Sequence, residues 1–463
     1  MALLFFPRGG SSHVTRSLAR ALPQTGWAPK LVTGSLGEPG AASNAATFFA
    51  GLDVTALDYT AAAEAPDPIA ADPPFQPSYE DRADAPDRVF ARVDDDDYER
   101  LVSAWEHELE RAGAAHADLL HLSHLTPINE AALRSFPGVP IVGHLHGTEL
   151  LMLREIDDGP PAGWAHAEAW AERMRRWARS CERLLVLSTD AVRRVPDLLG
   201  VERERVMWAP NGFDPEAFDR RPLKGAERMA LWRRWLVEEP QGWDESGEVG
   251  SVGYKESDLE AFDDDAPVLL YVGRYTEVKR LPLLIRAYAR ARERFDAPAP
   301  LVVLGGYPGE WEGEHPLRVV EESGARDVFL AGWHGHDDLP DGLNAADVTV
   351  LPSVREQFGQ VIVEGMACGL PAIAVDAHGP ATIVDAGETG WLVPPDDEDA
   401  MADALVEAVN DAGERERRGA AAYEAARGRY SWPALAEGVA EVYEQARTRG
   451  EPHGSPPALP DPG

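Results

Sequence analysis

Residues 268–292 read VLLYVGRYTEVKRLPLLIRAYARAR, and this stretch decides the fold of the chain around it. Its first five residues are apolar and predict a buried strand, whereas the apolar residues of 281–292 recur with the period of a helix. A second apolar strand follows at 301–304. Two strands joined by a helix predict a β-α-β unit with parallel strands.

The same alternation of strands and helices runs through the rest of the chain. Further strands are predicted at 348–351 and 372–375, and earlier ones at 3–6, 118–122, 140–144 and 184–188. A glycine turn at Gly9 and Gly10 leads from the first strand to a helix that carries Val14, Leu18 and Leu22 on one face. The chain is therefore predicted to be of the α/β class, with two doubly wound parallel sheets.

A chain of 463 residues is long enough for two hydrophobic cores. We predict an N-terminal Rossmann-like domain over 1–212, an acidic interdomain insertion over 213–266 and a C-terminal Rossmann-like domain over 267–431. The tail at 450–463 is rich in Pro and Gly and is predicted to be disordered. The insertion carries aromatic residues that either contact an acceptor or pack a long hinge, namely Trp232, Trp235 and Trp243.

The composition disfavours several classes of function. With 79 acidic against 44 basic side chains and a net charge of -35, nucleic acid is not expected as a partner. Two cysteines cannot make a disulfide framework, and no apolar run approaches 18 residues. These features predict a cytoplasmic protein. An apolar stripe among arginines leaves open either a core-facing helix or contact with the inner face of a membrane, and it comprises Trp170, Met174, Trp177 and Cys181.

Charged side chains follow two of the predicted strands of the C-terminal domain, where a doubly wound sheet binds ligands. Arg274 and Lys279 come after 268–272, and this pair of cations suits a diphosphate, although both could be ordinary surface cations. Glu356 and Glu364 come after 348–351. Carboxylates accept hydrogen bonds from sugar hydroxyls, but the two could equally be a loop acid and a helix surface charge.

Several motifs in the right order resemble those of the retaining GT-B glycosyltransferases of family four. The run 356–371, EQFGQVIVEGMACGLP, is similar to the family's signature. The segments 272–279, 209–214 and 144–150 are similar to its phosphate segment, its interdomain segment and its first active-site loop. A departure is Thr382, because the family often carries Glu near this position. The resemblance implies two Rossmann-like domains facing across a cleft, with a C-terminal helix at 432–449 that crosses back to the first domain.

The resemblance also implies a role for each candidate residue. Arg274 and Lys279 would hold the donor diphosphate, Glu364 the ribose, and Glu356 the hydroxyls of the donor sugar. His146 would hydrogen-bond the sugar from the first domain. The remaining implied donor-binding residues are Gly9, Gly10, Phe358 and Gly359.

The implied reaction moves a sugar from a UDP- or GDP-hexose to an acceptor hydroxyl of a glycan, a lipid-linked sugar or a small molecule, with retention of configuration. No carboxylate is placed as a nucleophile, so we expect a front-face reaction in which the leaving phosphate takes the acceptor proton. No cofactor or metal is expected, because 94–97 precedes a helix and the histidines around His144 lack further ligands. A GT-B nucleotide-sugar epimerase and a non-catalytic nucleotide-sugar-binding protein remain as alternatives.

Overall fold

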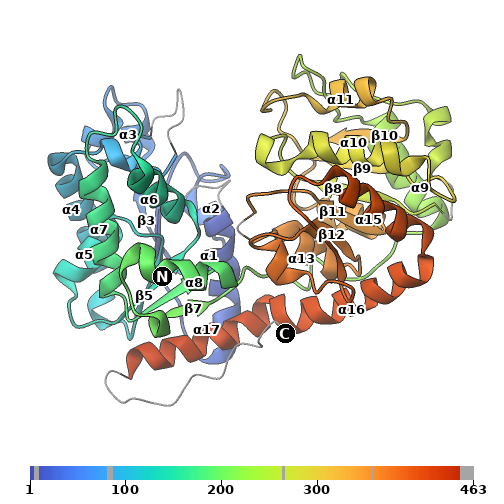
Figure 1. Ribbon diagram of the computed structural model, residues 1–463. Helices are drawn as coiled ribbons and strands as arrows, with labels where there is room; N and C mark the ends of the chain where they lie inside the picture. The colour runs from blue at the N-terminus through green and yellow to red at the C-terminus, as the bar shows by residue number, and fades with distance from the viewer. Residues whose placement is uncertain (5–9, 81–86, 263–265, 357, 449–463) are drawn as a thin grey trace. The chain divides into compact units, whose positions relative to one another are not determined.

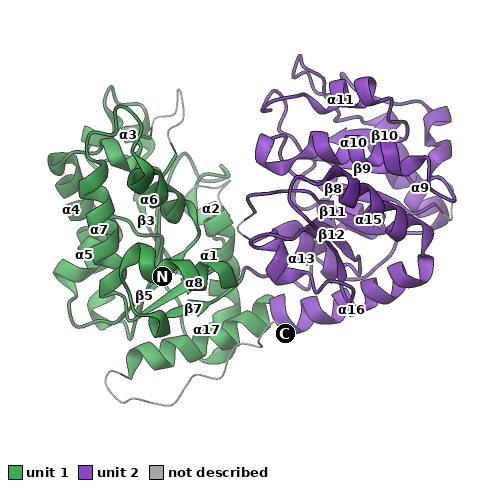
Figure 2. Cartoon of the chain, viewed as in Figure 1, with its two compact units in different colours: residues 1–210, 432–461, 463 green, residues 211–431, 462 purple. Residues whose placement is uncertain are grey.

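The computed structural model describes residues 1–4, 10–80, 87–262, 266–356 and 358–448, and it divides into two compact units. Unit 1 comprises 1–210 and the segment that starts at Trp432, and unit 2 runs from Asn211 to Ser431 (Figure 2). The segment 213–266, predicted as an interdomain insertion, is part of unit 2. Gly9 and the tail at 450–463 lie outside the described residues.

Unit 1 is built on a seven-stranded parallel sheet with the order β3-β2-β1-β4-β5-β6-β7. Figure 1 labels β3, β5 and β7 of this sheet and the helices that surround it. Its strands are β1 (Ala2–Leu3), β2 (Leu31–Ser35), β3 (Val54–Asp58), β4 (Leu120–Ser123), β5 (Ile141–Leu145), β6 (Arg183–Val186) and β7 (Val206–Trp208). Its main helices are α1 (Gly10–Ala21), α4 (Asp95–Arg111), α5 (Pro127–Ser135), α6 (Thr148–Asp158), α7 (Ala167–Ser180), α8 (Thr189–Leu199) and α17 (Trp432–Arg447). The predicted strands at 118–122, 140–144 and 184–188 correspond to β4, β5 and β6.

The helix α17 completes unit 1, because its apolar face packs against α1 and the sheet. Leu435, Val439 and Tyr443 share one buried cluster with Leu18 of α1 and Val142 of β5. Figure 2 accordingly colours α17 with unit 1, although it follows unit 2 in the sequence. This return of the last helix to the first unit agrees with the fold that the sequence motifs imply.

Unit 2 is built on a six-stranded parallel sheet with the order β10-β9-β8-β11-β12-β13. Its strands are β8 (Leu269–Val272), β9 (Leu301–Leu304), β10 (Val328–Gly332), β11 (Val348–Leu351), β12 (Ala372–Val375) and β13 (Gly390–Val393). Its main helices are α9 (Gly225–Arg233), α10 (Leu281–Arg292), α11 (Pro316–Ser323), α12 (Leu339–Asn344), α13 (Gln360–Ala367), α15 (Glu398–Asn410) and α16 (Ala412–Tyr430). The helix predicted at 281–292 is α10, and the strand predicted at 301–304 is β9.

The predicted insertion covers the β10 edge of the unit 2 sheet. Gln241 forms a β-bridge with Gly332 at the end of β10, and the Leu330 amide donates to the Tyr254 hydroxyl at 2.8 Å. The Trp243 indole N–H donates to the Gly306 carbonyl at 3.0 Å. All three tryptophans of the segment are buried, at 0–3% exposure. They are therefore packing residues of unit 2, and burial excludes the other alternative left open for them, contact with an acceptor.

The structure also bears on two other sequence predictions. Gly10 is the first residue of α1, the helix predicted after the glycine turn, whereas Gly9 and the rest of that turn lie outside the described residues. The stripe on α7, comprising Trp170, Met174, Trp177 and the adjoining Cys181, is completely buried. Its apolar side chains are in the core of unit 1, so they present no face to a membrane.

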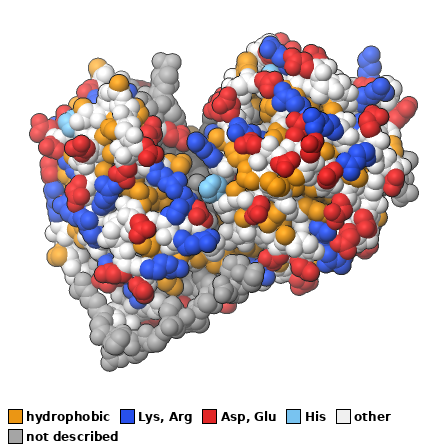
Figure 3. Space-filling model, viewed as in Figure 1, with side chains coloured by type: hydrophobic (Ala, Val, Ile, Leu, Met, Phe, Trp, Pro, Cys, Tyr) orange, Lys and Arg blue, Asp and Glu red, His pale blue; other side chains and the backbone are white. Residues whose placement is uncertain are grey.

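Charges of both signs are interspersed over the surfaces of the two units on the face that Figure 3 shows. Many arginines pair with acids, such as Arg286 with Glu314 at 2.7 Å and Arg175 with Asp157 at 2.6 Å. Asp94 of the acidic run caps α4, where its carboxylate accepts from the Asp97 amide at 2.9 Å. No helix within the described ranges has both the length and the apolar character that crossing a membrane requires.

Candidate functional site

The order of the unit 2 sheet reverses between two neighbouring strands. β8 pairs with both β9 and β11, so the connections that leave β8 and β11 run in opposite directions. In an open parallel sheet, ligands bind outside the carboxyl ends of the strands at such a reversal. The two loops at this position are 273–280 and 352–359, and they contain five of the predicted site residues, Arg274, Lys279, Glu356, Phe358 and Gly359.

An ion pair joins the two loops. The Lys279 ammonium contacts the Glu356 carboxylate, and the two side chains are only 18% and 20% exposed. Backbone contacts hold the loops together as well, since the Val354 amide donates to the Val278 carbonyl at 3.0 Å. The structure thus brings together a cation and an acid that stand 77 residues apart in the sequence.

Lys279 lies in a short 3-10 turn, Glu277–Lys279, that precedes α10. Arg280 then takes a left-handed conformation (φ 52°) before α10 begins at Leu281. Arg274 is exposed, and its carbonyl accepts a hydrogen bond from the Tyr271 hydroxyl at 2.9 Å. Both predicted cations therefore lie in the loop after β8 and not within the helix itself.

Glu364 occupies the second turn of α13 and is buried at 3% exposure. Its Oε1 atom lies 3.1 Å from Gln360 Nε2 and 3.1 Å from His336 Nε2. Gln360 also donates to the Gly212 carbonyl at 2.8 Å. The carboxylate is therefore held in one place at the carboxyl edge of the sheet, which excludes the alternative of a helix surface charge.

Sequence reasoning missed both partners of Glu364. Gln360 lies one helical turn before Glu364, so helical periodicity could have found it. His336 belongs to the loop after β10, four residues beyond its last strand residue, and only the order of the sheet brings it near α13.

Phe358 and Gly359 hold the backbone of the loop in its conformation. Phe358 is buried at 4% exposure, and its ring centroid lies 6.0 Å from that of Tyr430. Gly359 has a φ of 106°, a value that favours glycine. Gly379 packs so closely that a Cβ atom there would lie 2.1 Å from the Phe358 carbonyl oxygen. The side chain of Phe358 is thus part of the core of unit 2.

In unit 1, the carboxyl ends of β4 and β5 carry a second polar group of residues. His146 follows β5, and its ring centroid lies 4.6 Å from that of His124, which follows β4. The completely buried Glu149 accepts from the His146 amide at 2.8 Å and from His124 Nδ1 at 3.1 Å. Burial and the neighbouring histidines lower the pKa of His146 well below its usual value, so its imidazole is uncharged at neutral pH.

Two further histidines continue from this group into unit 1. The rings of His144 and His146 are stacked with centroids 4.4 Å apart, and His144 Nδ1 lies 3.2 Å from His121 Nε2. His121 Nδ1 in turn lies 2.5 Å from the Tyr443 hydroxyl of α17. The structure thus links four imidazoles, whereas the sequence indicated only His146 as functional.

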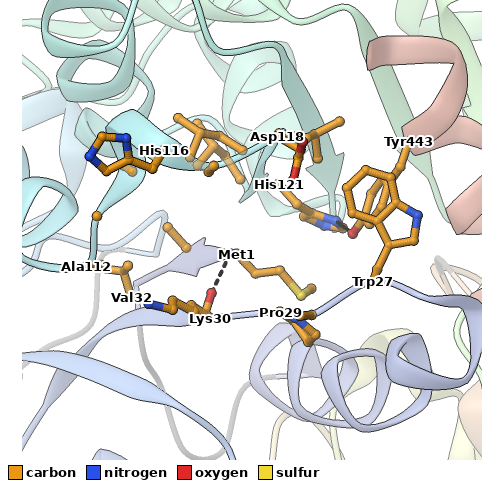
Figure 4. Close-up of a pocket in the computed structure, with 18 of the residues that line it drawn as sticks. Met1, Trp27, Pro29, Lys30, Val32, Ala112, His116, Asp118, His121 and Tyr443 are labelled. Carbon is orange, nitrogen blue, oxygen red and sulfur yellow. Dashed lines mark hydrogen bonds between the residues drawn. The ribbon is translucent and has the colours of Figure 1, made fainter. Parts of the chain in front are cut away.

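A cavity of about 370 Å³ lies at the amino ends of β1, β2 and β4 (Figure 4). Figure 4 shows the His121 ring pointing toward Tyr443, with Trp27 beside it. Lys30 and Asp118 also line this cavity. It is at the opposite edge of the sheet from His146, so it is separate from the candidate site.

Two family models match separate ranges of the chain, one mostly within each unit. Glycosyltransferase Family 4 matches residues 8–217, and Glycosyl transferases group 1 matches residues 255–425. A D-inositol 3-phosphate glycosyltransferase of Kribbella flavida is 38% identical over 320 residues, which are 66% of this chain and 66% of that protein. The protein of the same name from Kineococcus radiotolerans is 30% identical over 361 residues, which are 73% and 74% of the two chains.

Solved structures share the fold. Anabaena Alr3699/HepE in complex with UDP-glucose superposes with a TM-score of 0.63 at 18% sequence identity. The superposition covers 96% of this chain and 100% of that one. At this identity the match establishes the common architecture of two Rossmann-like domains.

Proposed function

The chain belongs to the family 4, group 1 glycosyltransferases of GT-B fold, and from this premise we propose that it transfers a hexosyl group from a UDP- or GDP-sugar to an acceptor hydroxyl with retention of configuration. The observation that carries the proposal is the pairing of Lys279 with Glu356 where the unit 2 sheet reverses its order. A cation and an acid at this edge can bind opposite ends of one ligand, a diphosphate and a sugar.

Each charged residue has a place in the proposed donor complex. Arg274 and Lys279 bind the diphosphate oxygens, and the buried Glu364 accepts hydrogen bonds from the ribose. Glu356 binds hydroxyls of the donor sugar. The uncharged imidazole of His146, in unit 1, adds a hydrogen bond to the same sugar.

We propose a front-face reaction at these groups. The bond between the anomeric carbon and the diphosphate oxygen breaks, and the acceptor oxygen bonds to the same face of that carbon. The acceptor proton passes to the departing phosphate oxygen. Arg274 and Lys279 stabilise the negative charge that develops on the leaving diphosphate, so the reaction is proposed to need no metal ion.

A thermal-shift screen with UDP-glucose, GDP-mannose and ADP-glucose tests the donor. A donor present at 100 times its Kd adds about 2.7 kcal/mol to the stability of the folded state, which is a measurable shift. Release of the nucleoside diphosphate is then followed with D-inositol 3-phosphate as the first acceptor, since the two relatives are named for it. NMR of the product gives the anomeric configuration, and the assay is repeated with EDTA.

Each result bears on a separate part of the proposal. An inverted product contradicts the front-face reaction, and loss of turnover in EDTA contradicts metal independence. Conversion of the donor sugar without any acceptor identifies an epimerase. A donor that binds without turnover against a wide panel of acceptors identifies a binding protein.

A further inference from the structure

The loop that carries His146 is held by a buried carboxylate, Glu149, which lies in the motif 144–150 but received no role from the sequence. Glu149 is in the first turn of α6 and is 0% exposed. One of its oxygens accepts from the His146 amide at 2.8 Å. The other accepts from His124 Nδ1 at 3.1 Å and from the Thr148 hydroxyl at 3.3 Å. Both oxygens therefore accept hydrogen bonds, from the loops that follow β4 and β5 and from the first residue of α6.

A buried carboxylate is costly unless its charge is compensated by hydrogen bonds or by an opposite charge. Burial by itself would raise the pKa of Glu149, but His124 and the loop amides more than offset this and lower it. The first turn of a helix also favours negative charge. The carboxylate is thus ionised and fixed, and it can hold its donors in place.

The contact with Glu149 also orients the His124 ring, which packs against the His146 ring. His124 has a left-handed backbone (φ 65°), and its amide donates to the His144 carbonyl at 2.8 Å. Its ring packs against that of His146 and is oriented by Glu149 through Nδ1. Non-glycine residues with positive φ persist where neighbouring contacts hold them, and such residues gather at functional sites.

His146 itself has a buried polar atom that makes no hydrogen bond to any described residue. Its Nε2 atom is buried and has no hydrogen-bond partner among the residues that the structure describes. Such an atom is costly in the free protein, and a ligand hydroxyl would satisfy it. The orientation of this imidazole is therefore the property that the surrounding contacts must preserve.

We propose that Glu149 is the positioning residue of the reaction: its carboxylate fixes the His146 backbone and the His124 ring, so that the His146 imidazole is held ready for the donor sugar. This inference rests on the proposed function, in which His146 binds that sugar. Glu149 itself touches no substrate. A displacement of about 1 Å in a positioned group can cost on the order of 10²-fold in rate, so the loss of Glu149 should appear in turnover.

The test is a double-mutant cycle on the full chain with Glu149→Gln and His146→Ala. The probe is whichever of UDP-glucose, GDP-mannose and ADP-glucose gives the largest thermal shift. Each single variant is expected to lower kcat by about 10²-fold with little change in the donor KM. The double variant is expected to be no slower than the slower single variant, because residues that act as one unit are not additive.

A matched control separates positioning from general loss of stability. Glu108 of α4 is a second buried acid of unit 1, at 3% exposure, and it pairs with Arg111. Glu108→Gln is expected to lower the unfolding temperature but not kcat. Should Glu149→Gln prove too unstable, Glu149→Asp keeps the charge, shortens the reach by one methylene and is expected to show the same loss of kcat.

The outcomes distinguish the inference from the function on which it rests. If the losses of kcat in the two single variants multiply in the double variant, the positioning role of Glu149 is overturned but the role of His146 is not. The same conclusion follows if Glu149→Gln has wild-type turnover while His146→Ala is impaired. Wild-type turnover in His146→Ala overturns both this inference and the role proposed for His146. The absence of a thermal shift with every donor overturns the proposed function as a whole.

Discussion

The ammonium of Lys279 and the carboxylate of Glu356 are in direct contact, and this ion pair connects the loops that leave β8 and β11. In the free protein each charge is partly neutralised by the other. A bound diphosphate would compete with Glu356 for Lys279, so the two residues should affect ligand binding in opposite directions.

Glu356→Gln is therefore expected to bind UDP at least as tightly as the natural protein, because Lys279 loses a competing partner. Its turnover should nevertheless fall, since the amide offers the sugar hydroxyls one uncharged acceptor oxygen in place of the two oxygens of an ionised carboxylate. Lys279→Gln should weaken the binding of UDP. It should also lower kcat by about 10²- to 10³-fold, the usual cost of removing one group that stabilises developing charge. Calorimetric titration with UDP and steady-state kinetics measure both. An equal loss of UDP affinity in the two variants contradicts the proposed roles.

The position of Glu364 predicts that the affinity for the nucleotide depends on the hydroxyls of the ribose. Glu364→Gln keeps the size of the side chain but replaces an acceptor-only carboxylate by an amide, so the affinity for UDP should fall by about 10-fold, or about 1.4 kcal/mol. The affinity for 2′-deoxyuridine diphosphate should fall less. Glu321→Gln, at an exposed position of α11, is the control. An equal loss for the two nucleotides would show that Glu364 does not contact the ribose.

The tryptophans of residues 213–266 allow a matched test of stability. The Trp243 N–H bonds the Gly306 carbonyl, whereas the Trp232 N–H is buried without a partner in the described part of the chain. Both Trp→Phe changes remove similar ring volume, but only Trp243→Phe leaves a carbonyl unpaired. Its free energy of unfolding should drop by about 1 kcal/mol more than that of Trp232→Phe. Chemical denaturation followed by fluorescence measures this, and equal losses would refute it.

The stability of the protein should decrease in mild acid because of His144. Burial, together with His124, lowers the pKa of His144 to about 4, against 6.5 for an ordinary histidine. As the pH falls below 6.5, His144 becomes protonated in the unfolded chain but stays uncharged in the folded chain. The free energy of unfolding therefore decreases until the pH reaches the pKa of the folded state. Between pH 7.5 and pH 5 this should cost about 2 kcal/mol, at about 1.4 kcal/mol per pH unit below 6.5.

Replacement of His144 by Gln should remove that part of the pH dependence. His116→Gln, at an exposed position, should leave the pH dependence as it is in the natural protein. Denaturation curves at the two pH values compare the variants. An unchanged difference in His144→Gln would mean that other groups cause the acid sensitivity.

The sequence by itself determined the class of fold and the family. The apolar runs at 268–272 and 301–304 and the helical period of 281–292 are local patterns, and parallel strands follow from the helix between them. Arg274, Lys279, Glu356 and Glu364 could be found because each directly follows a predicted strand or lies in the helix after it. Local signals of this kind need no knowledge of distant contacts.

Only the tertiary structure decided which distant residues meet. The order of the strands puts His336 beside Glu364, and the buried Glu149 between His124 and His146. It also puts Trp243 under the loop of Gly306, in a segment that the sequence suggested was a separate insertion. Hydrogen bonds and burial depend on distance in space, and separation along the chain does not reveal that distance until the sheet order is known.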